Sequence, residues 1–403
     1  MDNSGMTLER AEAAVRKILA IEDVTPGDER AGYLVRYRGQ LYSDDSAAAY
    51  DQLNELVKPL GLTPIFRMDE NRHSVLLVNR VASPGPSNPR VNLLFFILTL
   101  VSVWFTGGMM SVTELSSNWW ENLVQFVVKG WPFTVSMLGI LGAHEFGHYL
   151  AGRYHKVHVT LPYFIPLPFP FSPFGTMGAF INMKEVPRNR RILLDIGIAG
   201  PLAGLLVAIP VLLIGLSMSP LTQLPAAAAA NGVAQTQLEG NSIVYLLAKY
   251  TIFGQLLPAP VSFDGLSPAV YWLRYFFTGQ PLPYGGMDVS LDPVAWAGWG
   301  GLLITALNLI PAGQLDGGHM IYTLLGRKGV RRLLPIVLAA LVVLGFVWTG
   351  WWLWAALIFV LGRVYAEPLD TITQLDGRRK LMAILALVLF VLLFTPVPLS
   401  FML

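Results

Sequence analysis

The chain has 403 residues, of which 54% are hydrophobic and 13% are charged, whereas roughly 25% of residues in an ordinary soluble domain are charged. This composition favours a membrane protein. The formal net charge of +2 provides no basic surface for a phosphate backbone, so we expect no nucleic-acid partner. The sequence has no cysteine, which excludes disulfides, a cysteine nucleophile and thiolate ligands, so any metal site must use His, Asp or Glu.

Residues 1–82 have the composition of a soluble domain, and their periodicity predicts a small α+β head. The acidic N-terminus resembles neither a signal peptide nor a transit peptide, so we expect the head to lie in the cytoplasm. A linker rich in Pro, Gly and Ser follows over residues 83–90. The predicted elements of the head are helices over 8–20 and 46–60, a strand over 33–37, and strands over 63–68 and 74–78 joined by a turn at 69–71.

Residues 91–403 are predicted to form a polytopic α-helical membrane domain, because apolar runs close to the roughly 20 residues that span a bilayer recur along it. Lys and Arg flank alternate runs, which places the N-terminus in the cytoplasm and the segment at about 217–294 on the extracytoplasmic side. We expect a multi-pass protein of the cell membrane with about seven spans. The predicted spans are 91–110, 123–150, 192–216, 296–315, 333–348, 352–361 and 381–397.

Two adjoining segments do not fit a simple span. Residues 161–174 are apolar and aromatic but contain too many prolines for a helix or a central strand, which predicts a membrane-embedded loop shielded by protein. Residues 174–183 alternate in polarity and contain Gly175 and Gly178, where another backbone could approach. We predict that this segment is the edge that binds a substrate strand, and a turn packed against the bundle is the alternative.

The second predicted span ends in a compact group of ionisable residues, His144-Glu145-Phe146-Gly147-His148. Residues four apart on a helix share one face, so both imidazoles can bind one metal ion while Glu145 takes a proton from its water. The alternative is a set of polar side chains that satisfy one another inside a bundle. Ionisable groups within an apolar span are costly unless function retains them, which favours the metal site.

A catalytic zinc site needs a third protein ligand at the same depth. Lys129 is excluded because Lys is no ligand at neutral pH, and Asp195 has an ion-pair partner in the basic cluster at 188–191. This leaves Asp316, which lies where the fourth span breaks at Pro311 and neighbouring glycines and exposes backbone within a cavity. His319 is three residues away, so spacing alone leaves it open as a ligand. We expect it to make a supporting polar contact instead.

With its HExxH motif and a later span that breaks before Asp316, the sequence resembles the site-2 protease family of intramembrane zinc metalloproteases. That family is marked by HExxH in one span and by Asn-x-x-Pro and Leu-Asp-Gly in a later one, matched here at 144–148, 308–311 and 315–318. Residues 199–204 resemble its GPLA segment, and residues 175–178 resemble its glycine-containing membrane loop. The motifs lie within an expected catalytic core at about 124–325.

The resemblance implies a zinc metalloendopeptidase that holds one Zn²⁺ per chain and cuts single-span transmembrane proteins in the bilayer, as in regulated intramembrane proteolysis. It also implies that Asn308 hydrogen-bonds the substrate backbone or the oxyanion, with an interhelical contact as the alternative. A metal-ion or proton-coupled transporter is the competing function, because intramembrane His and Asp residues also serve transport. Glu145 separates the two, since a transporter needs no general base between two metal ligands.

Overall fold

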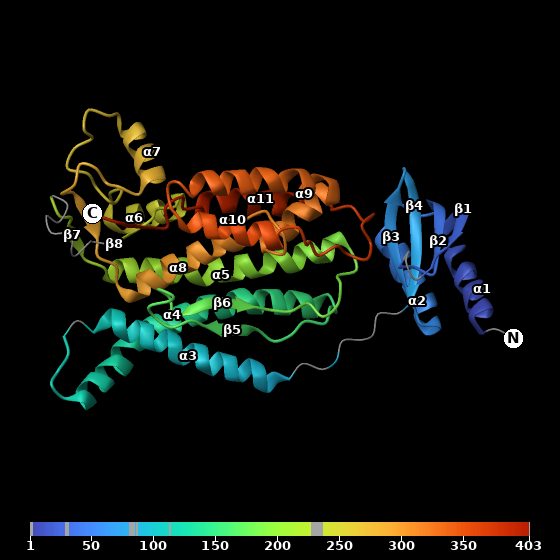
Figure 1. The fold of residues 1–403 in the computed structure, drawn as a ribbon, viewed down its shortest axis with the longest axis horizontal. Coiled ribbons are helices and arrows are strands. Elements are labelled where there is room, and N and C mark those ends of the chain that lie inside the picture. The colour runs from blue at the N-terminus through green and yellow to red at the C-terminus, as the bar shows by residue number, and fades with distance from the viewer. Residues whose placement is uncertain are drawn as a thin grey trace.

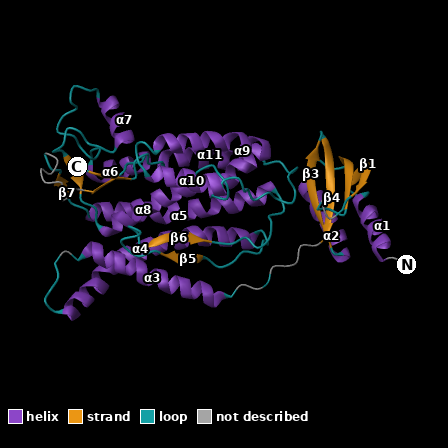
Figure 2. Cartoon of the chain, in the orientation of Figure 1, coloured by secondary structure: helices purple, strands orange, loops and turns teal. Residues whose placement is uncertain are grey.

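The structure is a computed structural model that describes residues 3–28, 32–79, 85, 88–112, 114–226 and 237–402. Half of the predicted linker at 83–90 lies outside these residues. Figure 1 shows three zones along the long axis: the head with its sheet at one end, a bundle of helices in the middle, and small elements around the C-terminus at the other end. Figure 2 shows that the strands described outside the head form short pairs.

The head is an antiparallel four-stranded sheet with two helices, in the strand order β1-β2-β4-β3. The predicted hairpin is confirmed, because Asp69 pairs with Arg72. Glu70 and Asn71 between them both have positive φ, as a tight two-residue turn requires. The elements are α1 (Asn3–Val15), β1 (Leu19–Pro26), β2 (Val35–Leu41), α2 (Ser46–Val57), a 3₁₀ turn (Lys58–Leu60), β3 (Leu62–Asp69) and β4 (Arg72–Asn79).

The helix predicted over residues 8–20 is wrong at its C-terminal end. Helix α1 stops at Val15, and residues 19–26 form β1, a strand that was not predicted. Ile18 and Leu19 are buried in the core of the head, where their apolar side chains support the sheet. Pairing of β1 with β2 is a tertiary contact, and it overrides the local helical periodicity.

The middle zone contains helices at all seven predicted spans. Among the described residues, three are long and apolar enough to cross a membrane: α3 (Pro89–Ser111), α4 (Trp119–Tyr154) and α5 (Arg190–Met218). The others are shorter or interrupted, so the count of about seven spans stays a prediction. They are α8 (Pro293–Asn308), α9 (Asp316–Leu344), α10 (Gly350–Leu361) and α11 (Gly377–Leu393).

The predicted break in the fourth span is confirmed. Helix α8 ends at Asn308, and the chain is non-helical until α9 begins at Asp316. Gly313 within the break has φ 59°, and a Cβ atom there would lie 2.8 Å from the Cα of Gly362. This position therefore requires glycine, both for its backbone conformation and for the close approach to the end of α10.

The Pro-rich segment 161–174 is not a loop throughout. Tyr163–Pro166 forms β5, which pairs antiparallel with β6 (Thr176–Phe180) to make a small hairpin beside α3 and α4 (Figure 1). The prediction of a loop alone is therefore wrong for these four residues. A two-stranded sheet has only edge strands, and edge strands tolerate proline, so β5 can form here.

The described parts of the segment 217–294, residues 217–226 and 237–294, contain several short helices and strands. Lys249 is completely buried among them, and its Nζ lies 3.2 Å from Glu239 Oε1 and 3.4 Å from Asp288 Oδ1. These buried charges are paired, as buried charges must be. The elements are β7 (Leu221–Gln223), β8 (Gln237–Glu239), α6 (Ile243–Phe253), α7 (Pro268–Thr278) and β9 (Met287–Val289), and β8 pairs with β10 (Leu399–Phe401) near the C-terminus.

The head is attached to the bundle by the connection between α10 and α11. The Phe66 N–H of edge strand β3 donates to the Leu369 carbonyl at 2.9 Å, and the Thr371 N–H donates to the Phe66 carbonyl at 3.2 Å. On its other side, the Asp370 N–H donates to the Arg188 carbonyl at 2.7 Å, directly before α5. The connection thus lies between the head and the start of α5 and bonds to both.

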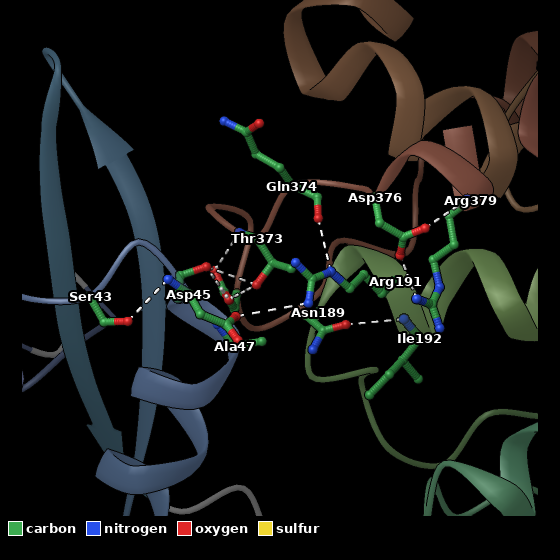
Figure 3. Close-up of polar contacts among 12 residues, drawn as sticks. Ser43, Asp45, Ala47, Asn189, Arg191, Ile192, Thr373, Gln374, Asp376 and Arg379 are labelled. Carbon is green, nitrogen blue, oxygen red and sulfur yellow. Dashed lines mark hydrogen bonds and ion pairs between the residues drawn. The ribbon is translucent and has the colours of Figure 1, made fainter. Parts of the chain in front are cut away.

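Side chains reinforce this junction (Figure 3). Arg191 of α5 donates from Nε to the Gln374 carbonyl at 2.9 Å, and its Nη1 lies 3.8 Å from the carboxylate of Asp45 in the head. The buried Asp370 carboxylate accepts from the hydroxyl of Ser46, which begins α2, and from the hydroxyl of Thr373. One carboxylate therefore bonds to the head and to the connection at once.

We predict that Asp370→Ala loosens the head from the bundle. The substitution leaves buried hydroxyl and N–H donors without an acceptor, at a cost of about 1–3 kcal/mol. Amide exchange at Phe66 and Thr371 should then accelerate by about 5-fold to 100-fold, as measured by hydrogen exchange with mass spectrometry. The control is Asp44→Ala, which removes an exposed acidic side chain from the loop between β2 and α2 of the head. Equal exchange in the two variants would show that Asp370 does not hold the junction.

Candidate metal centre

Two histidines of α4 and one aspartate of α9 meet inside the bundle. His144 and His148 are four residues apart on α4, and both are buried. Asp316 Oδ2 lies 3.2 Å from His144 Nε2, and Asp316 Oδ1 lies 3.3 Å from His148 Nε2. The two Nε2 atoms are 3.2 Å apart. The structure therefore brings the three predicted ligands into one triangle, in which a different carboxylate oxygen of Asp316 faces each histidine.

The size of this triangle suits a zinc ion. Tetrahedral Zn²⁺ binds imidazole nitrogen and carboxylate oxygen at about 2.0–2.2 Å, so neighbouring ligand atoms lie about 3.3–3.6 Å apart. The observed separations of 3.2 and 3.3 Å are close to the lower limit of that range. Two imidazoles and a carboxylate are also a donor set that zinc accepts. The residues present thus fit the metal.

A backbone carbonyl fixes the tautomer of His148. Its Nδ1 lies 2.7 Å from the carbonyl oxygen of Ile196 in α5. Because a carbonyl oxygen can only accept, Nδ1 carries the proton and Nε2 keeps its lone pair for a metal. Asn308 at the end of α8 has its Nδ2 3.4 Å from His144 Nε2, so the predicted asparagine also lies beside the ligands.

Glu145 and the three ligand residues line one cavity of about 200 Å³. Glu145 is 4% exposed, and its carboxylate interacts with the backbone of Ile181, just after β6. Phe180 and Ile181 line the same cavity, so the end of the hairpin forms one of its walls. A carboxylate that can move protons therefore lies next to the ligand triangle in the same cavity.

Comparison with protein families matches residues 132–348, more than half of the chain, to the family described as "Peptidase family M50". The chain belongs to peptidase family M50. The matched residues include all three corners of the ligand triangle and Glu145. The predicted resemblance to the site-2 protease family is confirmed by this match.

Curated relatives agree with the M50 assignment. The chain is 29% identical over 343 residues to the "Probable zinc metalloprotease EGY1, chloroplastic" of Arabidopsis thaliana, which covers 80% of this chain and 56% of that protein. It is 29% identical over 318 residues to the EGY2 protein of the same plant, with 75% and 50% coverage. The chain thus spans about half the length of these relatives. No solved structure matches it.

Two glycines of α5 make room for the histidines of this M50 centre. A Cβ atom at Gly200 would lie 2.0 Å from His148 Nε2, and one at Gly204 would lie 3.2 Å from the His144 ring. The role of these two glycines, like that of the Ile196 carbonyl, depends on how α5 packs against α4. The GPLA-like segment at 199–204 was the one signal in the sequence that pointed to the two glycines.

The other ionisable residues considered as ligands lie elsewhere. Asp195 does form an ion pair, but the predicted partner was wrong. Its carboxylate accepts from Arg379 of α11 at 2.6 and 2.8 Å and lies 3.0 Å from His155 Nε2, instead of pairing with the basic cluster at 188–191. Arg379 is distant in sequence, so local spacing could not identify it. Lys129 is exposed and donates to Gln125.

His319 lines the M50 cavity without joining the triangle. It is buried on the first turn of α9, and its Nδ1 has no hydrogen-bond partner among the described residues. The group of atoms close enough to share one metal ion contains His144, His148 and Asp316 but not His319. The supporting polar contact predicted for His319 is not seen at Nδ1 among the described residues, so its role stays a prediction.

The two glycines predicted to bind substrate differ in their surroundings. Gly175 has φ 74°, and a Cβ atom there would lie 2.6 Å from the Cα of Val103 in α3, so this glycine packs the hairpin against the bundle. Neither Gly175 nor Gly178 lines the cavity of the metal centre. Gly178 has φ 115° and open space where a Cβ atom would be. Only Gly178 is thus free for an approaching backbone.

We predict that Gly200→Ala prevents metal binding without unfolding the protein. The added methyl would occupy the space of the His148 ring, so Nε2 must leave the triangle. Losing one of three ligands should lower the zinc content of purified protein by at least about 10-fold, as measured by elemental analysis. Gly139→Ala in α4 has open space at its Cβ and is the matched control. Unchanged zinc in Gly200→Ala would contradict the observed packing.

Proposed function

We propose that the chain is an intramembrane zinc metalloprotease that hydrolyses peptide bonds of single-span transmembrane proteins. The observation that carries this proposal is the triangle of His144, His148 and Asp316 with Glu145 in the same cavity. Membership in peptidase family M50 and relatives named as probable zinc metalloproteases support the same activity. These comparisons give no support to a transporter.

Each residue of the centre has a proposed role. His144, His148 and Asp316 would hold one Zn²⁺, which would supply a Lewis acid and lower the pKa of water from about 15.7 toward about 7. Glu145 is the general base that takes a proton in the cavity and returns it to the leaving amine. The Ile196 carbonyl keeps the His148 ring in the orientation and tautomer that the site needs.

We propose that substrate binds along β6. A helical substrate must unwind before attack, and its freed backbone groups need new partners. Strand β6 pairs only with β5 among the described residues, and Ala179 and Phe180 of β6 line the cavity, so its other edge can receive an extended segment. Gly178 leaves room for that backbone, Asn308 is positioned to hydrogen-bond the substrate or the oxyanion, and Gly175 acts indirectly by shaping the hairpin.

The proposed arrangement is a multi-pass protein of the cell membrane with about seven spans, a cytoplasmic head and the metal centre toward the cytoplasmic side. The basic residues that flank alternate apolar helices support this orientation. The exposed apolar faces of α3, α4 and α5 support membrane insertion. The plant relatives are named chloroplastic, which gives no orientation in a cell membrane. The orientation proposed here therefore rests on the Lys and Arg residues of this chain.

We predict that Glu145→Gln abolishes proteolysis while zinc stays bound. The substitution keeps the size of the side chain and all three ligands but removes the base, which lowers rates by about 100-fold to 10,000-fold. Single-span membrane proteins are co-expressed with wild type or variant, fragments are mapped by mass spectrometry, and zinc is measured in parallel. Glu114→Gln, at an exposed position in the loop between α3 and α4, is the control. Undiminished fragments in Glu145→Gln would contradict the proposed mechanism.

The orientation can be tested in a chain that has no native cysteine. We predict that single cysteines at Asp44 in the head and Ser117 before α4, both exposed, react with impermeant maleimide from opposite sides of the membrane. The measurement is labelling of intact and opened vesicles. Labelling of both positions from one side would mean that the head and the loop before α4 are not separated by α3.

A further inference from the structure

A second cavity, of about 590 Å³, lies away from the metal centre, between α9 and the chain that follows α10. Three arginines line it: Arg327 and Arg331 from α9, and Arg363 just after α10. Its size is within the range of about 300–1,000 Å³ that is usual for small-molecule sites. The remaining lining residues are Tyr322, Val330, Leu334, Val364, Tyr365 and Glu367.

The charge of this arginine cavity is not balanced by the protein. Glu367 is the one carboxylate that lines it, at 3.8 Å from Arg327 and 3.9 Å from Arg67 of the head. Within the described part of the chain, no carboxylate lies within ion-pair distance of Arg331 or Arg363. The Arg363 guanidinium lies over the Phe359 ring at 4.8 Å, a contact that leaves its N–H donors available, so both guanidinium groups can bind an anion. Guanidinium binds phosphate oxygens through paired N–H donors, so a phosphate is the anion that fits best.

Apolar surface begins next to the arginine cavity. Phe359, Val360 and Leu361 at the end of α10 are 55–69% exposed, directly before Arg363. Such an exposed apolar stretch is suited to contact with lipid acyl chains. Because the arginine cavity adjoins the end of this stretch, its arginines would lie at the level of the lipid headgroups. Basic pockets between membrane helices at this level characteristically bind anionic headgroups.

An apolar groove of about 250 Å³ continues from the arginine cavity and shares Val364 with it. One wall is α10, with Trp354, Leu357 and Leu361. The other wall is the non-helical segment 312–315, which is followed directly by Asp316. The groove has few polar groups in its walls, so a hydrocarbon chain suits it better than a hydrated ligand.

We propose that the arginine cavity and the adjoining groove together bind one anionic phospholipid. Its phosphate contacts Arg331 and Arg363, with Arg327 nearby, and one acyl chain lies along α10 against the segment 312–315. The lipid thereby supports the segment that precedes Asp316. Neither part of this site includes a metal ligand or the general base, so the proposal of a lipid site does not rest on the proposed proteolysis.

The test compares lipid retention by the full chain. Purified protein is equilibrated with phosphatidylglycerol or phosphatidylcholine of identical acyl chains, and bound lipid is counted by native mass spectrometry. Wild type should retain phosphatidylglycerol with a preference of about 10-fold or more, which Arg331→Gln with Arg363→Gln should remove. Lys328→Gln with Arg332→Gln is the matched control, because it removes the same charge from exposed positions of α9 that do not line the cavity.

Three results would overturn the proposal: equal loss in both double variants, equal retention of the two lipids by wild type, or release of the lipid by millimolar inorganic phosphate. The first would indicate diffuse attraction, and the last a site for free phosphate. A second measurement needs no variant. Phosphatidylglycerol with a photoreactive acyl chain should label residues 312–315 and 354–361 of wild type, and labelling spread evenly over the exposed faces of α3 and α4 would contradict a specific site.

Discussion

The convergence of three polar side chains in an apolar bundle is the constraint on which the rest of this structure depends. Two imidazoles and a carboxylate within 3.3 Å of one another are expensive at membrane depth unless they share a cation. Helix α4 fixes the two histidines through local geometry. The third corner comes from a residue far along the chain, so the fold must return α9 to this point and interrupt a span to present Asp316.

Close helix packing makes this convergence possible. A Cβ atom at Gly147 of α4, between the two histidines, would lie 2.5 Å from the carbonyl oxygen of Ala199 in α5. The next residue of α5, Gly200, faces the His148 ring. Small residues on both sides let α4 and α5 approach until the Ile196 carbonyl reaches His148. The start of α5 also bonds to the connection that holds the head. One helix thus contacts both the metal centre and the head junction.

Local patterns in the sequence were enough for the parts of the site that lie on one element. HExxH on a helix predicts that His144 and His148 share a face, and the Pro and Gly residues around 311–318 predict the break before Asp316. The hairpin of β3 and β4 followed from alternation and a polar turn. What the sequence could not show was set by contacts between distant residues. Asp195 pairs with Arg379 rather than a neighbouring arginine, Gly175 packs on α3 away from the cavity, and β1 replaces a helical turn.

The most direct test of this account is the zinc content of wild type, Asp316→Asn and His319→Gln at equal expression. Asp316→Asn keeps the shape of the side chain but removes the charge at one corner of the triangle, so zinc should fall from about one ion per chain to near zero. His319→Gln should retain most of the zinc, with affinity lowered by no more than about 10-fold to 100-fold. Zinc retained in Asp316→Asn and lost in His319→Gln would contradict the ligand set, and would require a centre built on three histidines.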